Sequence, residues 1–128
     1  MSAALNIIQQ AYEAFGRRDI PALLNLVADQ VDWEFVGSAN LAYAGRRQNK
    51  NEVASFFSEL EKADDTLAFE PREFIEAGDN VTVLGWVKGI ARDTNIPFET
   101  QWAHLFTVRD GKVARWRGFA NTAARYGY

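Results

Sequence analysis

Close to residue 64 the dominant spacing of apolar residues along this chain changes, from three or four positions to two. Earlier apolar residues recur every three or four positions, which predicts amphipathic helices, the first over residues 3–17. Later apolar and polar residues alternate, which predicts four long strands. We expect these strands over residues 67–77, 80–91, 98–109 and 112–121. Helices followed by an antiparallel meander define the α+β class, in which one face of the sheet covers the helices.

Capping and turn residues divide the chain further. Asp19 is typical of a helix N-cap and predicts a second helix through Val27, and Asn49 or Asn51 can cap a third. We interpret Asp64 and Asp65, at the end of this third helix, as solvated side chains. The segment "VDWEFVG" predicts a strand over 31–37, followed by a loop over 38–48. The sets "GDN", "RDTNIP" and "RDGK" are turn-forming and separate the long strands.

Length and charge exclude several classes of protein. A chain of 128 residues predicts a single domain over residues 1–128. A net charge of −3 disfavours a nucleic-acid surface, which requires clustered Lys and Arg. The sequence has no cysteine and one histidine, so we expect neither a disulfide nor a metal site. No apolar run is long enough for a membrane span, and the cytoplasm is the expected compartment.

Four segments carry a resemblance to a known family: "AYEAFGRRDIPALLNLVAD", "VDWEF…LAYAG", "IEAGDNVTVLG" and "WAHLFTVRDGKVARWRGFANTAA". They resemble the SnoaL-like, ketosteroid isomerase-related branch of the nuclear-transport-factor-2-like superfamily. The resemblance implies a cone-shaped, curved antiparallel or mixed sheet, a cystatin-like roll, wrapped around three N-terminal helices. A ligand pocket would open at one end. The fold hosts isomerases, polyketide cyclases, dehydratases, epoxide hydrolases and non-catalytic binders, so the resemblance alone does not fix the function.

The ketosteroid isomerase residues are only partly matched. That family uses a carboxylate base with a Tyr and a protonated Asp as oxyanion donors. The resemblance places the base at Phe35, which cannot accept a proton, and the tyrosine at Ala11, one residue before Tyr12. The donor acid falls on His104. The standard ketosteroid isomerase mechanism therefore lacks two of its groups.

Two other reactions of the superfamily also lack residues. Epoxide hydrolases of the limonene type use an Asp-Arg-Asp set, and the matching strand here reads "LGWVKGIA", without an acid. Many SnoaL-like relatives carry an Asp near the end of the last strand, where this chain has Asn121. Asparagine keeps hydrogen-bonding capacity but is not a base.

Strand alternation predicts which residues face the helices. On the third long strand His104 shares a face with Phe106 and Val108, which predicts an inward imidazole. On the strand before it, Gly85 and Gly89 lie on the matching face, and we expect them to leave volume for a cavity. On the last strand Val113 and Trp116 can both face inward only with a bulge at Ala114–Arg115, which we predict.

The candidate site combines these predictions with the resemblance. His104 is the candidate catalytic residue, as a hydrogen-bond or proton donor whose charge can change near neutral pH. Its alternative role is that of an ordinary core histidine satisfied by Tyr12 or a backbone carbonyl. Tyr12, Tyr43 and Asn121 have structural alternatives too, as a packed helix residue, a loop anchor and a strand-end cap. The candidate ligand-binding residues are Tyr12, Trp33, Phe35, Tyr43, Gly85, Val87, Trp102, Trp116 and Asn121.

The predicted function is a pocket for a small apolar molecule, with no metal or organic cofactor. One hypothesis is an isomerase, cyclase or lyase acting on a carbonyl-bearing ligand that His104 polarises. A second is a binding protein without turnover, and a third is a dimeric assembly domain with a vestigial cavity. Trp86, Lys88, Arg115 and Arg117 are expected on the outer sheet face, where aromatic and charged residues together predict a homodimer interface.

Overall fold

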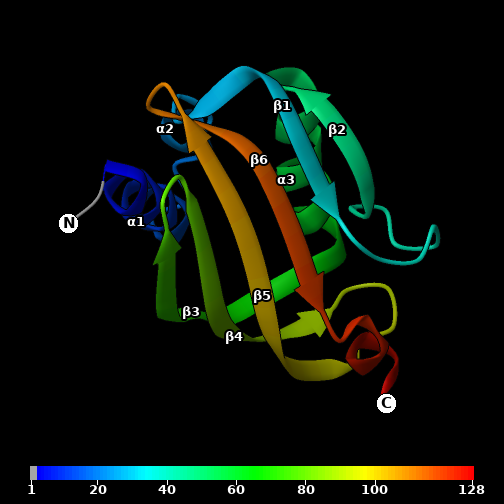
Figure 1. Cartoon of the computed structure of the whole chain (residues 1–128). Coiled ribbons are helices and arrows are strands. Elements are labelled where there is room, and N and C mark those ends of the chain that lie inside the picture. Colours follow the sequence, from blue (N-terminus) through cyan, green and yellow to red (C-terminus); the bar gives the residue numbers. More distant parts are fainter. Residues whose placement is uncertain (1–2) are drawn as a thin grey trace.

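The computed structural model describes residues 3–128, and in it a curved sheet wraps around three helices (Figure 1). The helices are α1 (Ala3–Gly16), α2 (Ile20–Leu24) and α3 (Lys50–Ala63). The strands are β1 (Val27–Phe35), β2 (Gly45–Asn49), β3 (Asp64–Ala77), β4 (Asn80–Ala91), β5 (Pro97–Arg109) and β6 (Lys112–Ala120). A short 3₁₀ helix, η1 (Thr122–Tyr126), follows β6. The predicted α+β class and cone-like architecture are confirmed.

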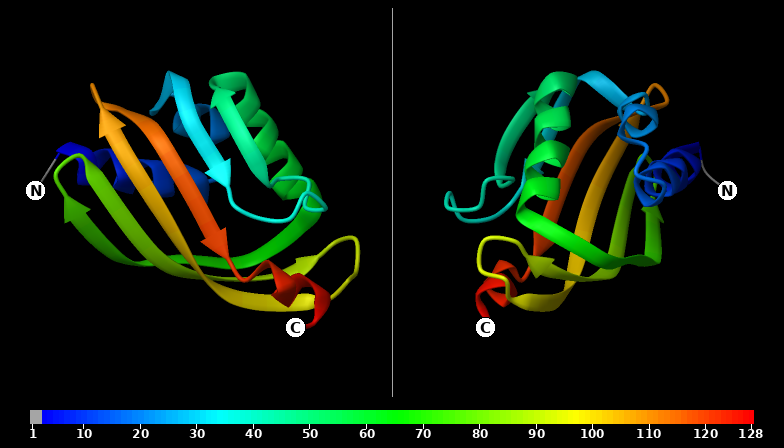
Figure 2. Two further views of the ribbon diagram at one scale, coloured as in Figure 1. Left: turned by 45° about the vertical axis from the view of Figure 1, so that its right-hand side comes forward. Right: turned by 180° about the vertical axis from the view of Figure 1, so that it is seen from behind.

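The six strands form one mixed sheet in the order β2-β1-β6-β5-β4-β3. Only β1 and β6 pair in parallel, and the other neighbours are antiparallel. Seen from behind, α3 and α1 lie in front of the concave face of the sheet (Figure 2). The sheet does not close on itself, so the space between its concave face and the helices holds the core and the candidate site.

The helix caps agree with the sequence pattern. The Asp19 side chain accepts a hydrogen bond from the backbone N–H of Ala22 at 3.1 Å, and Asn49 accepts one from Glu52 at 3.0 Å. These bonds satisfy donors that a helix N-terminus otherwise leaves unpaired. The prediction that the second helix continues through Val27 is wrong, because Val27 already belongs to β1 and is buried beside β6.

The turn between β5 and β6 shows why Asp-Gly is a strong hairpin signal. Asp110 and Gly111 both have positive φ, 52° and 74°. Two successive residues with positive φ match the twist of a two-residue hairpin, and Gly adopts this conformation without steric cost.

The predicted bulge in the last strand is present. Phe106 pairs with Trp116 and Thr107 with Arg115, but Val108 pairs with Val113, so Ala114 has no partner in the register. As a result Val113 and Trp116 are both buried on the concave side. The extra residue allows two large side chains at odd spacing to face the core.

The expected loop over 38–48 is wrong at its end, because residues from Gly45 onward form β2 against β1. This strand reads "GRRQN" and has no apolar alternation for a pattern to detect. Its inward residue is Arg47, which donates to the backbone oxygen of Tyr43 at 3.1 Å and lies over the ring of Phe56 at 5.4 Å. The inward contact of this strand is therefore made by the Arg47 side chain packed on the ring of Phe56, where other strands use an aliphatic side chain.

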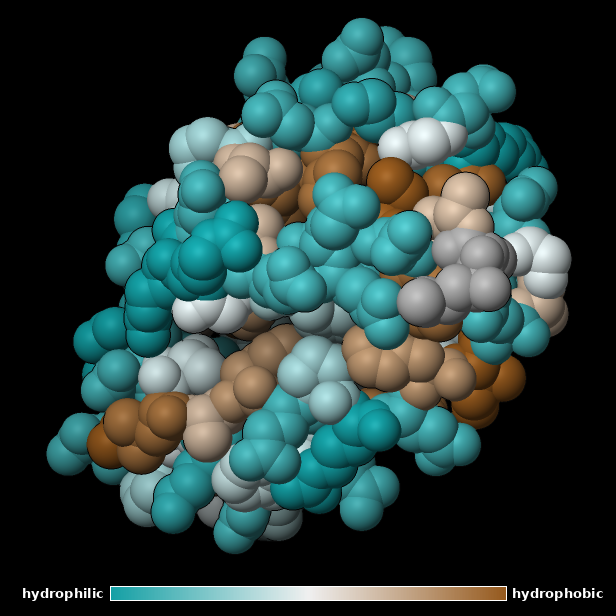
Figure 3. Space-filling view, turned by 90° about the vertical axis from the view of Figure 1, so that its left-hand side faces the viewer, coloured by the Kyte–Doolittle hydropathy of each residue, from teal (hydrophilic) through white to brown (hydrophobic). Residues whose placement is uncertain are grey.

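The outer face of the sheet is mixed in character. Leu84, Leu105 and Phe119 are exposed there, at 37%, 37% and 41%. Trp86 donates to Glu99 at 3.0 Å and lies under the guanidinium of Arg72, at 5.0 Å. The homodimer expected through this face stays a prediction. Seen from the side of α1, the surface is largely hydrophilic with separate hydrophobic patches (Figure 3).

Candidate functional site

A cavity of about 130 Å³ lies between the concave face of the sheet and the helices. For comparison, an engineered apolar cavity of about 150 Å³ admits benzene. Most lining side chains are aromatic or aliphatic, and the polar ones sit at two separate places. Among the lining residues within 3–128, Asn121 alone is exposed, so the cavity meets the surface beside η1.

His104 and Tyr12 form a hydrogen-bonded pair at the inner end. The distance between the Tyr12 hydroxyl oxygen and His104 Nδ1 is 2.7 Å, and the two rings are nearly parallel, at 6°. Tyr12 comes from α1 and His104 from β5, so the pair joins the helix layer to the sheet. Within residues 3–128, no protein group hydrogen-bonds to His104 Nε2.

Either tautomer leaves this pair with one free donor. If Tyr12 donates to Nδ1, the proton on the imidazole is at Nε2. If Nδ1 carries the proton and donates to Tyr12, the phenolic O–H is free instead. The tautomer is therefore an assignment, but the presence of one unpaired donor hydrogen does not depend on it.

Burial keeps both members of the pair neutral. It lowers the pKa of His104 from 6.5 to about 3 and raises the pKa of Tyr12 well above its ordinary value. The expectation of a charge change near neutral pH is wrong for this histidine, since the site offers no counter-charge for an imidazolium. His104 is instead a neutral hydrogen-bonding group at physiological pH.

Aromatic rings enclose His104 on several sides. The Trp102 indole stacks on it with 4.0 Å between centroids, and Trp116 meets it edge-on at 5.0 Å. Phe69 from β3 stacks on Trp102 at 4.7 Å. The indole N–H groups of Trp33 and Trp102 are buried and have no hydrogen-bond partner within residues 3–128. These rings limit the contact of the pair with water, which strengthens any hydrogen bond made there.

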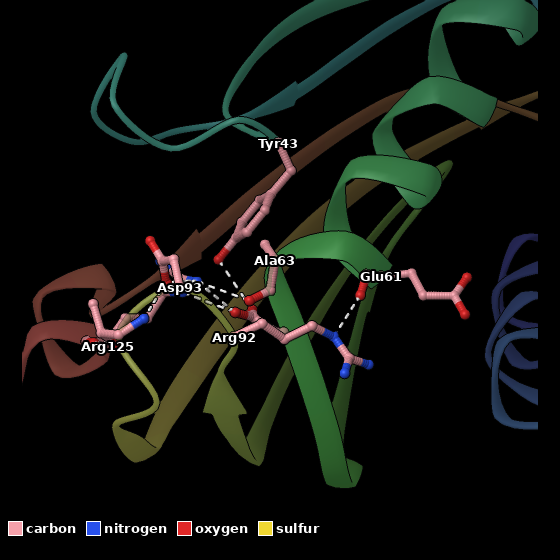
Figure 4. A network of polar contacts seen from close by, with 8 residues as sticks. Tyr43, Glu61, Ala63, Arg92, Asp93 and Arg125 are labelled. Carbon is pink, nitrogen blue, oxygen red and sulfur yellow. Dashed lines mark hydrogen bonds and ion pairs between the residues drawn. The ribbon is translucent and has the colours of Figure 1, made fainter.

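A second polar place lies at the η1 end, where Tyr43, Asp93 and Arg125 converge beside Ala63 at the end of α3 (Figure 4). At its centre is Asp64, the first residue of β3, which is 8% exposed. Arg125 donates to Asp64 Oδ1 from Nη2 at 2.7 Å and from Nε at 2.9 Å. The Tyr43 hydroxyl donates to Asp64 Oδ2 over a longer distance, 3.4 Å.

Burial and the ion pair shift the pKa values of Asp64 and Arg125 in opposite directions. Burial raises the pKa of Asp64, although the hydrogen bond from Arg125 opposes the shift. For Arg125, burial lowers the pKa, but the hydrogen bond and charge of Asp64 outweigh it, and the net shift is upward. Burial and the Asp64 carboxylate both raise the pKa of Tyr43. The cluster is thus a buried ion pair with a neutral phenol.

Most of the predicted site residues lie on the cavity wall. These are Tyr12, Trp33, Phe35, Tyr43, Val87, Trp102, His104, Trp116 and Asn121. Tyr12 is the hydrogen-bond partner of His104, as the alternative role of a core histidine predicted, and the Tyr43 hydroxyl contacts Asp64. The Asn121 side chain does not cap η1. Whether these residues bind a ligand stays a prediction.

Gly85 is not on the cavity wall, and the expected role of the glycines needs correction. A Cβ at Gly85 would overlap the Trp102 indole, and one at Gly89 would lie 3.1 Å from the Phe98 ring. A Cβ at Gly118 would overlap Trp116 in the same way. These glycines provide the space in which large rings lie flat against the sheet, so the rings, and not an empty volume, occupy it.

Sequence reasoning missed Asp64 and Arg125. Asp64 was expected on a solvated helix face, but it starts β3 and is buried by a residue 61 positions later in the chain. Arg125 was not considered, because a single Arg in a C-terminal segment carries no local signal. The available signal was the position of Asp64, which comes shortly before a long predicted strand at a point where the third helix ends without a Gly.

Within residues 3–128, no group of three or more His, Asp or Glu side chains is arranged to hold a metal ion. No helix of that range has the length and apolar character needed to cross a membrane.

The comparisons with known proteins define first a fold class. At 28% identity the chain resembles a nuclear-transport-factor-2-like protein from Burkholderia xenovorans LB400, with a TM-score of 0.86 over 98% of this chain and 94% of the other. A protein with a ketosteroid isomerase-like fold from Catenulispora acidiphila, in complex with trimethylamine, matches at 15% identity and a TM-score of 0.78, over 94% and 89% of the two chains. This second likeness concerns the fold alone.

The family follows from the sequence match. The model of the SnoaL-like domain matches residues 8–116, and the chain belongs to this family. At 26% identity it is also similar to TerC, co-crystallised with polyporic acid, with a TM-score of 0.87 over 98% of this chain and 97% of that one. No curated protein matches the sequence.

Proposed function

We propose that the protein binds a small, mainly apolar molecule with a carbonyl oxygen in this cavity, and that the His104–Tyr12 pair donates a hydrogen bond to that oxygen. The single observation behind the proposal is the pair itself, a neutral imidazole held by a 2.7 Å hydrogen bond among aromatic rings. A pair that always has one unpaired donor in a mainly apolar cavity suits a ligand with an acceptor and an apolar body.

Such a donor also supports chemistry at the carbonyl. A hydrogen bond to the carbonyl oxygen stabilises the negative charge that develops there when an α-proton is removed or a carbon nucleophile adds. A neutral histidine serves this purpose because its N–H remains a donor without a counter-ion. We therefore propose an isomerase, cyclase or lyase acting on a carbonyl compound. The similarity to TerC, co-crystallised with polyporic acid, supports a small organic ligand.

A ligand pair that differs only in the carbonyl tests the binding step. Acetophenone and 4-acetylbiphenyl would be titrated beside ethylbenzene and 4-ethylbiphenyl, with tryptophan fluorescence and NMR shifts as readouts. We expect the ketones to bind about 3- to 10-fold more tightly, as a neutral hydrogen bond allows. His104→Phe should remove this preference. Leu105→Ala, one position along on the outer face, is the matched control and should keep it.

Deuterium exchange of the acetyl protons in D₂O separates an enzyme from a binder. An enzyme accelerates this exchange, and His104→Phe should lower the rate by about 100-fold, the effect of losing one oxyanion donor. Tight ketone binding without faster exchange would instead support the alternative, a binding protein without turnover. Equal affinity for ketones and hydrocarbons would contradict the proposed role of His104.

A further inference from the structure

The carboxylate of Asp64 has two unequal oxygens. Oδ1 accepts both short bonds from Arg125, at 2.7 and 2.9 Å. Among residues 3–128, Oδ2 accepts only from the Tyr43 hydroxyl, at 3.4 Å, which is beyond the usual range for an O–H donor. A carboxylate oxygen can accept two hydrogen bonds, so Oδ2 of a buried Asp64 has unused capacity.

The residue that carries this oxygen lines the cavity described above. Asp64, Tyr43 and Arg125 all line it, together with Asn121 at the opening. Within residues 3–128 the Asn121 amide group makes no side-chain hydrogen bond, although its backbone N–H donates to Thr100 at 3.2 Å. An unused carboxylate oxygen and a free amide therefore lie at the same end of an otherwise apolar cavity.

The register of the sheet separates this end from the His104 end. Asp64 pairs with Ala91 and His104 pairs with Val83, eight residues away on β4. Eight residues of extended strand span about 26 Å, and a curved strand spans less. A ligand that reaches from one end toward the other must be longer than a single ring.

Charge decides which group suits the Asp64 end. Arg125 neutralises Asp64, and Asp93 lies 3.6 Å from the same guanidinium, so a ligand carboxylate would meet excess negative charge. A ligand cation would have to compete with Arg125, which already holds the Asp64 carboxylate through two short hydrogen bonds. A neutral donor avoids both costs and completes the coordination of Oδ2.

We propose that Asp64 Oδ2 and the Asn121 amide form a second polar subsite, which binds a hydroxyl group of the ligand. This inference rests on the proposed function and names the ligand class more closely. The ligand has a carbonyl at the inner end and a hydroxyl at the end near η1, and any part of it that exceeds the cavity of about 130 Å³ extends through the opening beside Asn121.

Hydroxylated and plain ketones test the subsite directly. The probes are 4-hydroxyacetophenone against acetophenone, and 4-acetyl-4′-hydroxybiphenyl against 4-acetylbiphenyl, each titrated with the wild-type protein. We expect the hydroxyl to tighten binding of the biphenyl by about tenfold, because a hydrogen bond to a carboxylate is stronger than a neutral one. The one-ring probe should gain less, since it is the shorter of the two and comes less close to Asp64 when its ketone is at His104.

Variants then assign the gain to Asp64. The pair Asp64→Asn with Arg125→Gln replaces both charges by amides of similar shape, and should remove most of the hydroxyl gain while the ketone preference stays. Tyr43→Phe keeps the ring and removes the competing O–H, so the hydroxyl gain should stay or increase. Circular dichroism and thermal melting show that each variant is folded.

The outcomes separate the two proposals. If the ketones bind through His104 but the hydroxyl gives no gain with either scaffold, the subsite is wrong and the proposed function stands. The role of Asp64 is also overturned if the ligand hydroxyl still tightens binding to the variant with Asp64→Asn and Arg125→Gln. It is overturned as well if Tyr43→Phe removes the effect of the hydroxyl. If neither ketone binds the wild-type protein, both proposals fall together.

Discussion

At the inner end of the cavity one hydrogen bond joins His104 and Tyr12, while at the η1 end Asp64, Arg125 and Tyr43 form a charged network. Both ends are buried, yet burial has different results. The inner pair has no counter-charge, so burial keeps it neutral and lowers the pKa of His104 to about 3. The outer cluster has an opposite charge in contact, so the ions persist. The comparison shows that the presence of a partner, more than burial, decides whether a charge survives.

The largest expected effect comes from breaking the charged end. Arg125→Gln leaves Asp64 buried without its counter-ion, and we expect a loss of about 3–5 kcal/mol in the free energy of unfolding, measured with urea. The exposed pair of Arg72 and Glu70, with a similar distance of 2.9 Å, is the matched control. Arg72→Gln should cost about 1 kcal/mol or less. Equal losses in the two variants would show that burial of the Arg125–Asp64 pair does not increase its contribution to the free energy of unfolding.

Acidification should lower the free energy of unfolding of the protein through His104, at the neutral end of the cavity. The unfolded chain protonates His104 below about pH 6.5, whereas the folded protein does so only near pH 3, so the unfolded state binds more protons between these values. Stability therefore falls as pH drops, by about 2 kcal/mol between pH 7 and 5.

Urea unfolding of His104→Gln at the same two pH values isolates this contribution, because the carboxylates are common to both proteins. The variant should lose about 2 kcal/mol less than the wild type over that interval. An equal loss in both proteins would mean that His104 titrates normally and has solvent or a counter-charge that the cavity does not show.

The smallest effect compares one substitution at the two ends. Tyr12→Phe removes a 2.7 Å bond and leaves a buried ring nitrogen unpaired, which should cost about 1–2 kcal/mol. Tyr43→Phe removes a 3.4 Å bond from a carboxylate that Arg125 still holds, and should cost about 0.5 kcal/mol or less. Thermal melts of the two variants measure the difference. The reverse order would show that Tyr43 is the more important anchor.

Local patterns made much of the fold predictable. Alternation in β5 placed His104 on the same side as Phe106, and the odd spacing of Val113 and Trp116 required the bulge that is observed. Asp19 and the Asp110-Gly111 turn act within a few residues of themselves, so their roles can be read from the sequence. Strand β2 had no such pattern, since an arginine stem supplies its buried contact.

The sequence by itself determined the order of helices and strands, the inward face of β5 and the aromatic character of the cavity. These features follow from periods of two and about 3.6 residues, which are local. Only the tertiary structure decided that Tyr12 meets His104 across 92 positions, that Arg125 buries Asp64 across 61, and that the glycines of the sheet lie under aromatic rings. These contacts depend on where the curved sheet brings distant segments together, and no local spacing encodes that curvature.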